Sequence, residues 1–164
     1  MKKYELVPVE GVALYRIRAL IAFTTYSGKK INVGDLGGYV ESESNLSHDR
    51  NAWIGGDAIV SEGAVVSWDA EVSDNARVYG SAKIFGYAQI YENARIFGYA
   101  KVHGLAKIYG YAEIFGHAEI SRDARIFDFA RVFGYAMING DDVVCGDSRL
   151  PTQAPAVNGL QDRK

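Results

Sequence analysis

The sequence predicts an all-β protein, a parallel β-helix of about six coils with three strands in each 18-residue coil. Three observations predict this fold. A six-residue repeat runs for about seventeen units, from near Leu46 to near Asp147. In each unit an alanine and an isoleucine or valine lie two residues apart, so both point to the same side of a short strand. Glycine usually stands fifth, where it permits a turn that other residues resist.

The repeat is clearest from Ala76 onward. In units of six the chain reads ARVYGS, AKIFGY, AQIYEN, ARIFGY, AKVHGL, AKIYGY, AEIFGH, AEISRD, ARIFDF, ARVFGY, AMINGD. Charged, amide and aromatic residues alternate with the apolar positions and therefore point outward. A helical solenoid would need a period of about 3.6 residues, and disorder would lack the regular β-branched positions. Such coils stack at about 4.8 Å, the separation of neighbouring strands.

Two neighbouring units show the aliphatic/small pairs of a known pattern, Val78 with Ala82 and Ile84 with Ala88. This pattern resembles the hexapeptide signature of the left-handed β-helix superfamily over about 100 residues of the chain. The resemblance implies left-handed coils. It is less informative about function, because that superfamily includes trimeric acyltransferases, nucleotidyltransferase domains, a class of carbonic anhydrases, ice-binding proteins and scaffolds.

The open ends of a solenoid need covering, and the N-terminal segment has the pattern for it. Apolar residues alternate from Tyr15 to Phe23, Ser27-Gly28 is typical of a turn, and residues 30–33 resemble a return strand. We therefore expect a β-hairpin over the first coil. This gives three segments: an N-terminal cap at residues 1–35, the repeats at 36–147 and an extended tail at 148–164.

Composition limits the classes of partner. The formal net charge is −2, from 18 basic and 20 acidic residues, so nucleic acid is not expected as the main partner. Cys145 is the only cysteine, which excludes an internal disulfide and suits a reducing compartment. No apolar stretch resembles a signal peptide or approaches the roughly 20 residues of a membrane span. These features predict a cytoplasmic protein with no membrane partner.

Residues 18 apart stack on one face, so the outward residues can be assigned to faces. Face A contains residues 77–79, 95–97, 113–115 and 131–133, face B contains 83–85, 101–103, 119–121 and 137–139, and face C contains 89–91, 107–109, 125–127 and 143–145. Aromatic residues gather on faces A and C and at the corner that joins C to A. They are Tyr79, Phe97, Phe115 and Phe133 on face A, Tyr91, Tyr109 and Phe127 on face C, and Tyr111 and Phe129 at the corner.

Two explanations fit this aromatic edge. Ladders of aromatic side chains stabilise a sheet by about 0.2–1 kcal/mol for each neighbouring pair. A patch of about ten aromatic residues, however, exceeds the few hundred Å² that a monomer usually exposes. Arg95, Arg125 and Arg131 lie beside it, and aromatic residues with arginine are typical of binding surfaces.

We therefore expect a non-catalytic homo-oligomeric scaffold or binding protein, with a trimer about the aromatic edge as the simplest assembly. A partner protein or a small planar ligand such as a nucleotide is the competing occupant. The predicted interface or ligand-binding residues are Tyr79, Tyr91, Arg95, Phe97, Tyr109, Tyr111, Phe115, Arg125, Phe127, Phe129, Arg131 and Phe133.

The alternative is a trimeric acyltransferase with its active site between subunits. The resemblance implies a histidine as general base, for which His117 and His103 are weak candidates. The repeat frame shows no insertion from Leu46 to Asp147, so no loop is expected to build a pocket wall. A carbonic-anhydrase type of zinc site needs about three converging histidines, and His48 lies about three coils from the others. We expect no metal, no cofactor and no ice-binding array of threonines.

Overall fold

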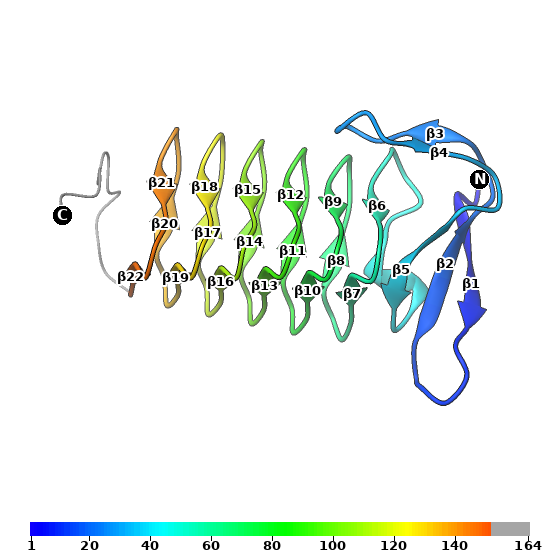
Figure 1. The fold of residues 1–164 in the computed structure, drawn as a ribbon, viewed down its shortest axis with the longest axis horizontal. Coiled ribbons are helices and arrows are strands. Elements are labelled where there is room, and N and C mark those ends of the chain that lie inside the picture. The colour runs from blue at the N-terminus through cyan, green and yellow to red at the C-terminus, as the bar shows by residue number, and fades with distance from the viewer. Residues whose placement is uncertain (152–164) are drawn as a thin grey trace.

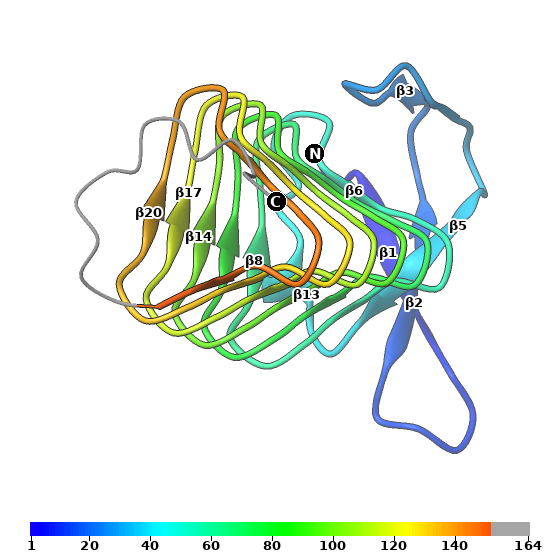
Figure 2. The same ribbon diagram turned by 60° about the vertical axis from the view of Figure 1, so that its left-hand side comes forward.

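The computed structural model describes residues 1–151 as a parallel β-solenoid of about six coils, as predicted (Figure 1). Each coil is a triangle of three short strands, and Figure 2 shows the coils stacked behind one another. From residue 53 onward, paired residues of neighbouring coils are 18 apart, as in the pairing of Val78 with Ile96, whereas Val40 pairs with Val60. The fold is thus all-β except for one short 3₁₀ helix, η1 (Glu43–Asn45), within the described range.

The strands form three parallel sheets, one on each face. Face A contains β5 (Leu36–Val40), β7 (Ile59–Val60), β10 (Arg77–Val78), β13 (Arg95–Ile96), β16 (Glu113–Ile114), β19 (Arg131–Val132) and β22 (Arg149–Leu150). Face B contains β8 (Val65–Val66), β11 (Lys83–Ile84), β14 (Lys101–Val102), β17 (Glu119–Ile120) and β20 (Met137–Ile138). Face C contains β6 (Trp53–Ile54), β9 (Glu71–Val72), β12 (Gln89–Ile90), β15 (Lys107–Ile108), β18 (Arg125–Ile126) and β21 (Val143–Val144).

The core consists of the inward positions of the repeat. Every such alanine and isoleucine or valine from Ala52 to Val132 is fully buried. Full burial of one valine or isoleucine contributes about 1.5–3 kcal/mol, so the stacked coils supply the main driving force for folding. The core positions are uniform along the axis, and the differences between coils lie outside.

The fifth position of the repeat is a left-handed turn throughout. Seventeen residues, every sixth from Arg50 to Gly146, have φ between 56° and 75°. Ten of them are glycine, and the coils are closest at Gly104, where an added Cβ would lie 2.6 Å from the backbone nitrogen of Arg122. Several of the others are acidic and use their side chains: the Glu92 carboxylate accepts a hydrogen bond of 2.8 Å from the Gly110 N–H, one coil further along.

One corner departs from the predicted frame. Leu46 bridges Val66, 20 residues away, whereas Ile54 pairs with Val72 at the regular distance of 18. The corner at residues 47–51 therefore contains two additional residues. The prediction of a frame without insertion from Leu46 is wrong here, because Leu46 takes the place of an isoleucine or valine and not that of an alanine.

The N-terminal residues form two antiparallel hairpins beside the first coil (Figure 1). Strand β1 (Tyr4–Pro8) pairs with β2 (Tyr15–Ala19), and β2 pairs antiparallel with β5 on face A. Strand β3 (Phe23–Thr24) pairs with β4 (Lys30–Ile31) around the predicted turn. The predicted continuous strand from Tyr15 is divided into β2 and β3, and β1 was not predicted, because its short apolar stretch has no clear alternation.

A buried lysine joins this segment to the wide corner. The ammonium group of Lys3 donates hydrogen bonds to the carbonyl oxygens of Ala52, at 2.7 Å, and Arg50, at 3.2 Å. Burial lowers the pKa of Lys3 to about 8. The Tyr4 hydroxyl donates to the Leu46 carbonyl at 2.6 Å, and the His48 ring stacks on Tyr4 at 4.2 Å. The wide corner therefore packs against Lys3 and Tyr4 at the N-terminus.

At the other end, β22 continues the register of face A one strand beyond residue 147. The rest of the predicted tail at 148–164 lies outside the described residues from 152 onward. Within residues 1–151, the structure contains no helix long and apolar enough to cross a membrane.

Candidate binding surface

The predicted aromatic columns are present and their rings stack on one another. On face A the rings of Tyr79, Phe97, Phe115 and Phe133 lie 4.9–5.1 Å apart with planes within 6° of parallel. On face C the rings of Tyr91, Tyr109 and Phe127 stack at 4.9 Å. These spacings follow the strand separation, since each ring occupies the same position in successive coils.

Stacking changes the expected exposure of these columns. All seven rings are half-buried, because each ring covers the face of the next. The expected continuous patch of about ten exposed aromatic residues is therefore too large. The ring faces are used within the protein, and the columns present ring edges to solvent.

The strongly exposed aromatic rings lie at corners. Tyr111 and Phe129, at the corner between faces C and A, stack at 5.3 Å and are 57% and 59% exposed. A second exposed column, at the corner between faces A and B, contains Tyr99, His117 and Tyr135. Sequence reasoning missed this second column, although the same 18-residue spacing of aromatic residues would have found it.

A row of charged side chains runs along face A beside the first of these corners. One carboxylate oxygen of Glu113 lies 3.2 Å from an Arg95 guanidinium nitrogen, and the other lies 2.8 Å from Nε of Arg131. Arg149 follows Arg131 at the next coil. Arg95 also donates a hydrogen bond of 3.0 Å to the Tyr79 hydroxyl. One carboxylate thus holds two of three neighbouring arginines in place.

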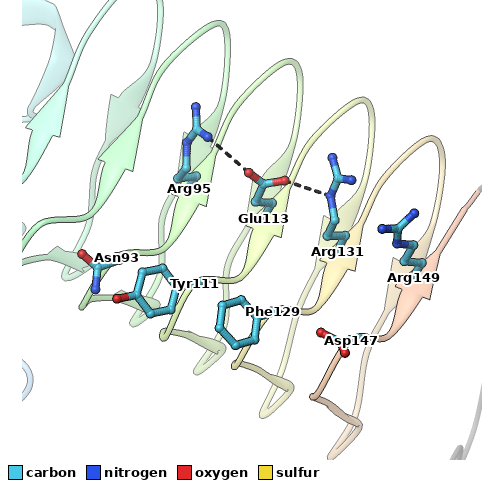
Figure 3. Close-up of a pocket in the computed structure, with 8 residues that line it drawn as sticks. All are labelled: Asn93, Arg95, Tyr111, Glu113, Phe129, Arg131, Asp147 and Arg149. Atoms are coloured by element: carbon cyan, nitrogen blue, oxygen red, sulfur yellow. Dashed lines mark hydrogen bonds and ion pairs between the residues drawn. The ribbon is translucent and has the colours of Figure 1, made fainter.

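These side chains line an open groove of about 830 Å³ that runs along the solenoid axis. Figure 3 shows its two walls as parallel rows. We call them the corner row, which is Asn93, Tyr111, Phe129 and Asp147, and the arginine row, which is Arg95, Glu113, Arg131 and Arg149. The three arginines outnumber the two carboxylates, so the groove carries a net positive charge.

The groove includes four of the twelve predicted site residues: Arg95, Tyr111, Phe129 and Arg131. The other predicted residues lie outside the groove lining. Arg125, Tyr91, Tyr109 and Phe127 lie around the corner on face C, where burial is the main cause that raises the pKa of Tyr91 and of Tyr109. The sequence prediction did not include Asn93, Glu113 and Asp147, because it weighted aromatic and arginine residues. It did not include Arg149, because this residue lies beyond the predicted end of the repeats at residue 147.

The candidate catalytic histidines lie in different surroundings. His103 on face B stacks on Phe85 at 4.6 Å, and its Nε2 lies 3.0 Å from a Glu119 carboxylate oxygen. His117 is exposed between two tyrosine rings. No cluster of three or more histidine, cysteine, aspartate or glutamate side chains that could hold a metal occurs within residues 1–151.

Comparison with known proteins agrees with the fold. A family model described as the YdcK beta solenoid repeat matches residues 70–84 and 88–104, so these parts of the chain are similar to that repeat. The comparison with curated proteins gives no match. The fold and this similarity define the chain as a β-solenoid repeat protein.

Proposed function

We propose that this chain is a non-catalytic, homo-oligomeric β-solenoid scaffold or binding protein that assembles through the corner between faces C and A. The observation that carries the proposal is the groove with its two rows, in which Tyr111 and Phe129 expose more than half of their surface beside three arginines. Exposed aromatic residues with arginine are typical of the centres of protein interfaces.

A planar ligand is the weaker candidate for this surface. A base or sugar ring stacks on the face of an aromatic ring. In the columns of faces A and C each interior ring has both of its faces covered, and at the corner Tyr111 and Phe129 cover one face of each other, so a planar ligand finds at most one open face on each corner ring. A protein surface that contacts ring edges and guanidinium groups over several coils fits this geometry better.

The subunit number and the wider relationship are also proposals. The hexapeptide pattern favours left-handed coils and the trimer that is common in the superfamily it resembles. A trimer about the corner edge would cover the groove of every subunit. The single cysteine favours a cytoplasmic location, where thiols stay reduced.

A single charge inside the groove tests the proposal. We expect Phe129→Lys to shift the protein toward monomer in sedimentation velocity, because an added cation would be repelled by the arginines of the groove and would lose its hydration in a closed interface. Tyr135→Lys is the matched control, since Tyr135 is at least as exposed, at 67%, but lies at the other corner of face A. Equal sedimentation of both variants and the wild type would contradict the proposal.

The second candidate function is an acyltransferase with its active site between subunits. One observation favours it: the Glu119 carboxylate is placed to orient His103, as the acidic partner of a general base does. The structure therefore favours His103 over His117 for that role. Acyl-CoA turnover that disappears in His103→Ala, but persists in His117→Ala, would establish this function and overturn the non-catalytic proposal.

A further inference from the structure

Each coil contributes one residue to the corner row and one to the arginine row of the groove, and we call such a pair a level. The two side chains of every level are chemically complementary. Going along the axis, the four levels are Asn93 beside Arg95, Tyr111 beside Glu113, Phe129 beside Arg131, and Asp147 beside Arg149. Each combination is attractive: an amide oxygen or a carboxylate with a guanidinium, a phenol with a carboxylate, and a ring with a guanidinium. The level before the groove, Asn75 beside Arg77, follows the same rule.

The chain does not make these pairs internally. Within residues 1–151, no hydrogen bond, ion pair or cation–π contact joins the two members of any of the four levels. Arg131 instead lies over the Phe115 ring, and the ion pairs of the groove run along the arginine row (Figure 3). Asp147 and Arg149 are both exposed and make no ion pair in this range.

We propose that the groove receives a second copy of the chain, with the two solenoid axes parallel and the coils in register. The corner row of one copy then lies against the arginine row of the other. Asp147 meets the partner's Arg149, and Phe129 meets the partner's Arg131. This contact rests on the self-assembly proposed above and specifies its orientation and register.

The spacing of the groove favours a second copy over other protein partners. The levels recur at the separation of neighbouring strands, about 4.8 Å. A partner that contacts four successive levels must repeat at the same interval, and another copy of this solenoid does so by construction. The contact applies equally to a two-fold or a three-fold axis parallel to the solenoid, because both bring corner row against arginine row at equal heights.

Other arrangements of two copies are less complementary. An antiparallel copy places Arg95 opposite the partner's Arg149, so that like charges face each other in the interface. A parallel copy displaced by one coil in one direction places Phe129 against the partner's Glu113. Displacement in the other direction leaves Asp147 beyond the partner's last arginine. Only the parallel, in-register copy matches all four levels.

Disulfide cross-linking between two separately purified variants tests the orientation. In a Cys145→Ser background, we expect Asn93→Cys mixed with Arg95→Cys to give a mixed, covalent dimer on oxidation. Arg95→Cys mixed with Arg149→Cys should give no more dimer than the face B control Lys101→Cys, because the two positions lie three coils apart. An affinity tag on one variant identifies the mixed species.

Charge exchange tests the register in the unlinked protein. By sedimentation equilibrium we expect Asp147→Arg and Arg149→Asp each to weaken assembly at least tenfold, and the double variant to recover to within about threefold of wild type. Efficient disulfide formation between Arg95→Cys and Arg149→Cys, or a double charge variant that assembles as weakly as the single variants, would overturn the parallel contact. Neither result would contradict self-assembly itself. A wild-type protein that stays monomeric would overturn both.

Discussion

The fifth position of the repeat shows how single residues satisfy the backbone of this solenoid. A residue with a Cβ atom pays about 1–2 kcal/mol to adopt the left-handed conformation at this position, and glycine avoids this cost. Glu62, Asp74, Glu92 and Asp128 offset it with a carboxylate that accepts an N–H from the next coil, at 2.8–3.1 Å. The sequence predicts the turn from its glycines. It does not predict these hydrogen bonds, which depend on the residue one coil away.

Glu92 allows a test of this compensation. We expect Glu92→Ala to lower the free energy of unfolding by about 1–2 kcal/mol, since it keeps the left-handed conformation and loses the acceptor. Glu92→Gln retains a side-chain oxygen and should remain near wild type, with Glu92→Gly between the two. Urea denaturation measures all three. Equal values for the alanine and glutamine variants would contradict the role of the hydrogen bond.

Lys3 makes stability depend on pH in a defined direction. Burial lowers its pKa from 10.5 to about 8 in the folded protein. Between these values the unfolded chain binds the proton and the folded protein does not, so stability rises with pH over this window. Below pH 8 both states are charged and the cost of burying the ammonium group is present in full.

The variant Lys3→Met removes this dependence. We expect the free energy of unfolding of the wild type, relative to Lys3→Met, to increase from pH 8 to about 10.5 and to stay constant at pH 6–7. Tyr4, whose pKa is raised mainly by burial, is present in both proteins and cancels in the comparison. Parallel pH profiles of the two proteins would show that Lys3 keeps its ordinary pKa.

At the scale of elements, the stacked columns stabilise the sheets and also decide what the surface can bind. The 18-residue spacing predicts which residues share a column, and the structure confirms those columns. Exposure could not be predicted in the same way, because it depends on the ring orientation that stacking imposes. Half-buried columns on faces A and C therefore contrast with exposed rings at the corners.

The face A column predicts unequal effects along its length. Phe115 stacks on both Phe97 and Phe133, whereas Phe133 stacks on Phe115 alone. We expect Phe115→Ala to reduce the free energy of unfolding by about 0.5–1.5 kcal/mol more than Phe133→Ala, the value of one additional aromatic pair. Thermal or urea unfolding gives the comparison. A larger loss in Phe133→Ala would indicate that the column contributes little beyond local burial.

At the scale of the whole molecule, the core positions of all coils are alike, whereas the outward side chains differ from coil to coil. The repeat predicts the coils, their register and the three faces, because each depends only on spacing. The two extra residues near His48 and the strand β1 could not be predicted, because they depend on contacts between the N-terminal segment and the first coil. The groove is likewise a product of two rows that lie side by side only after the solenoid has formed.

We propose that another copy of the chain closes the groove between faces C and A. Light scattering coupled to size-exclusion chromatography measures the mass in solution directly. We expect the wild type to form a species whose mass is a multiple of 18.0 kDa, and we expect Phe129→Lys to reduce it to a single chain. A wild-type protein that elutes at 18.0 kDa at all concentrations would contradict it.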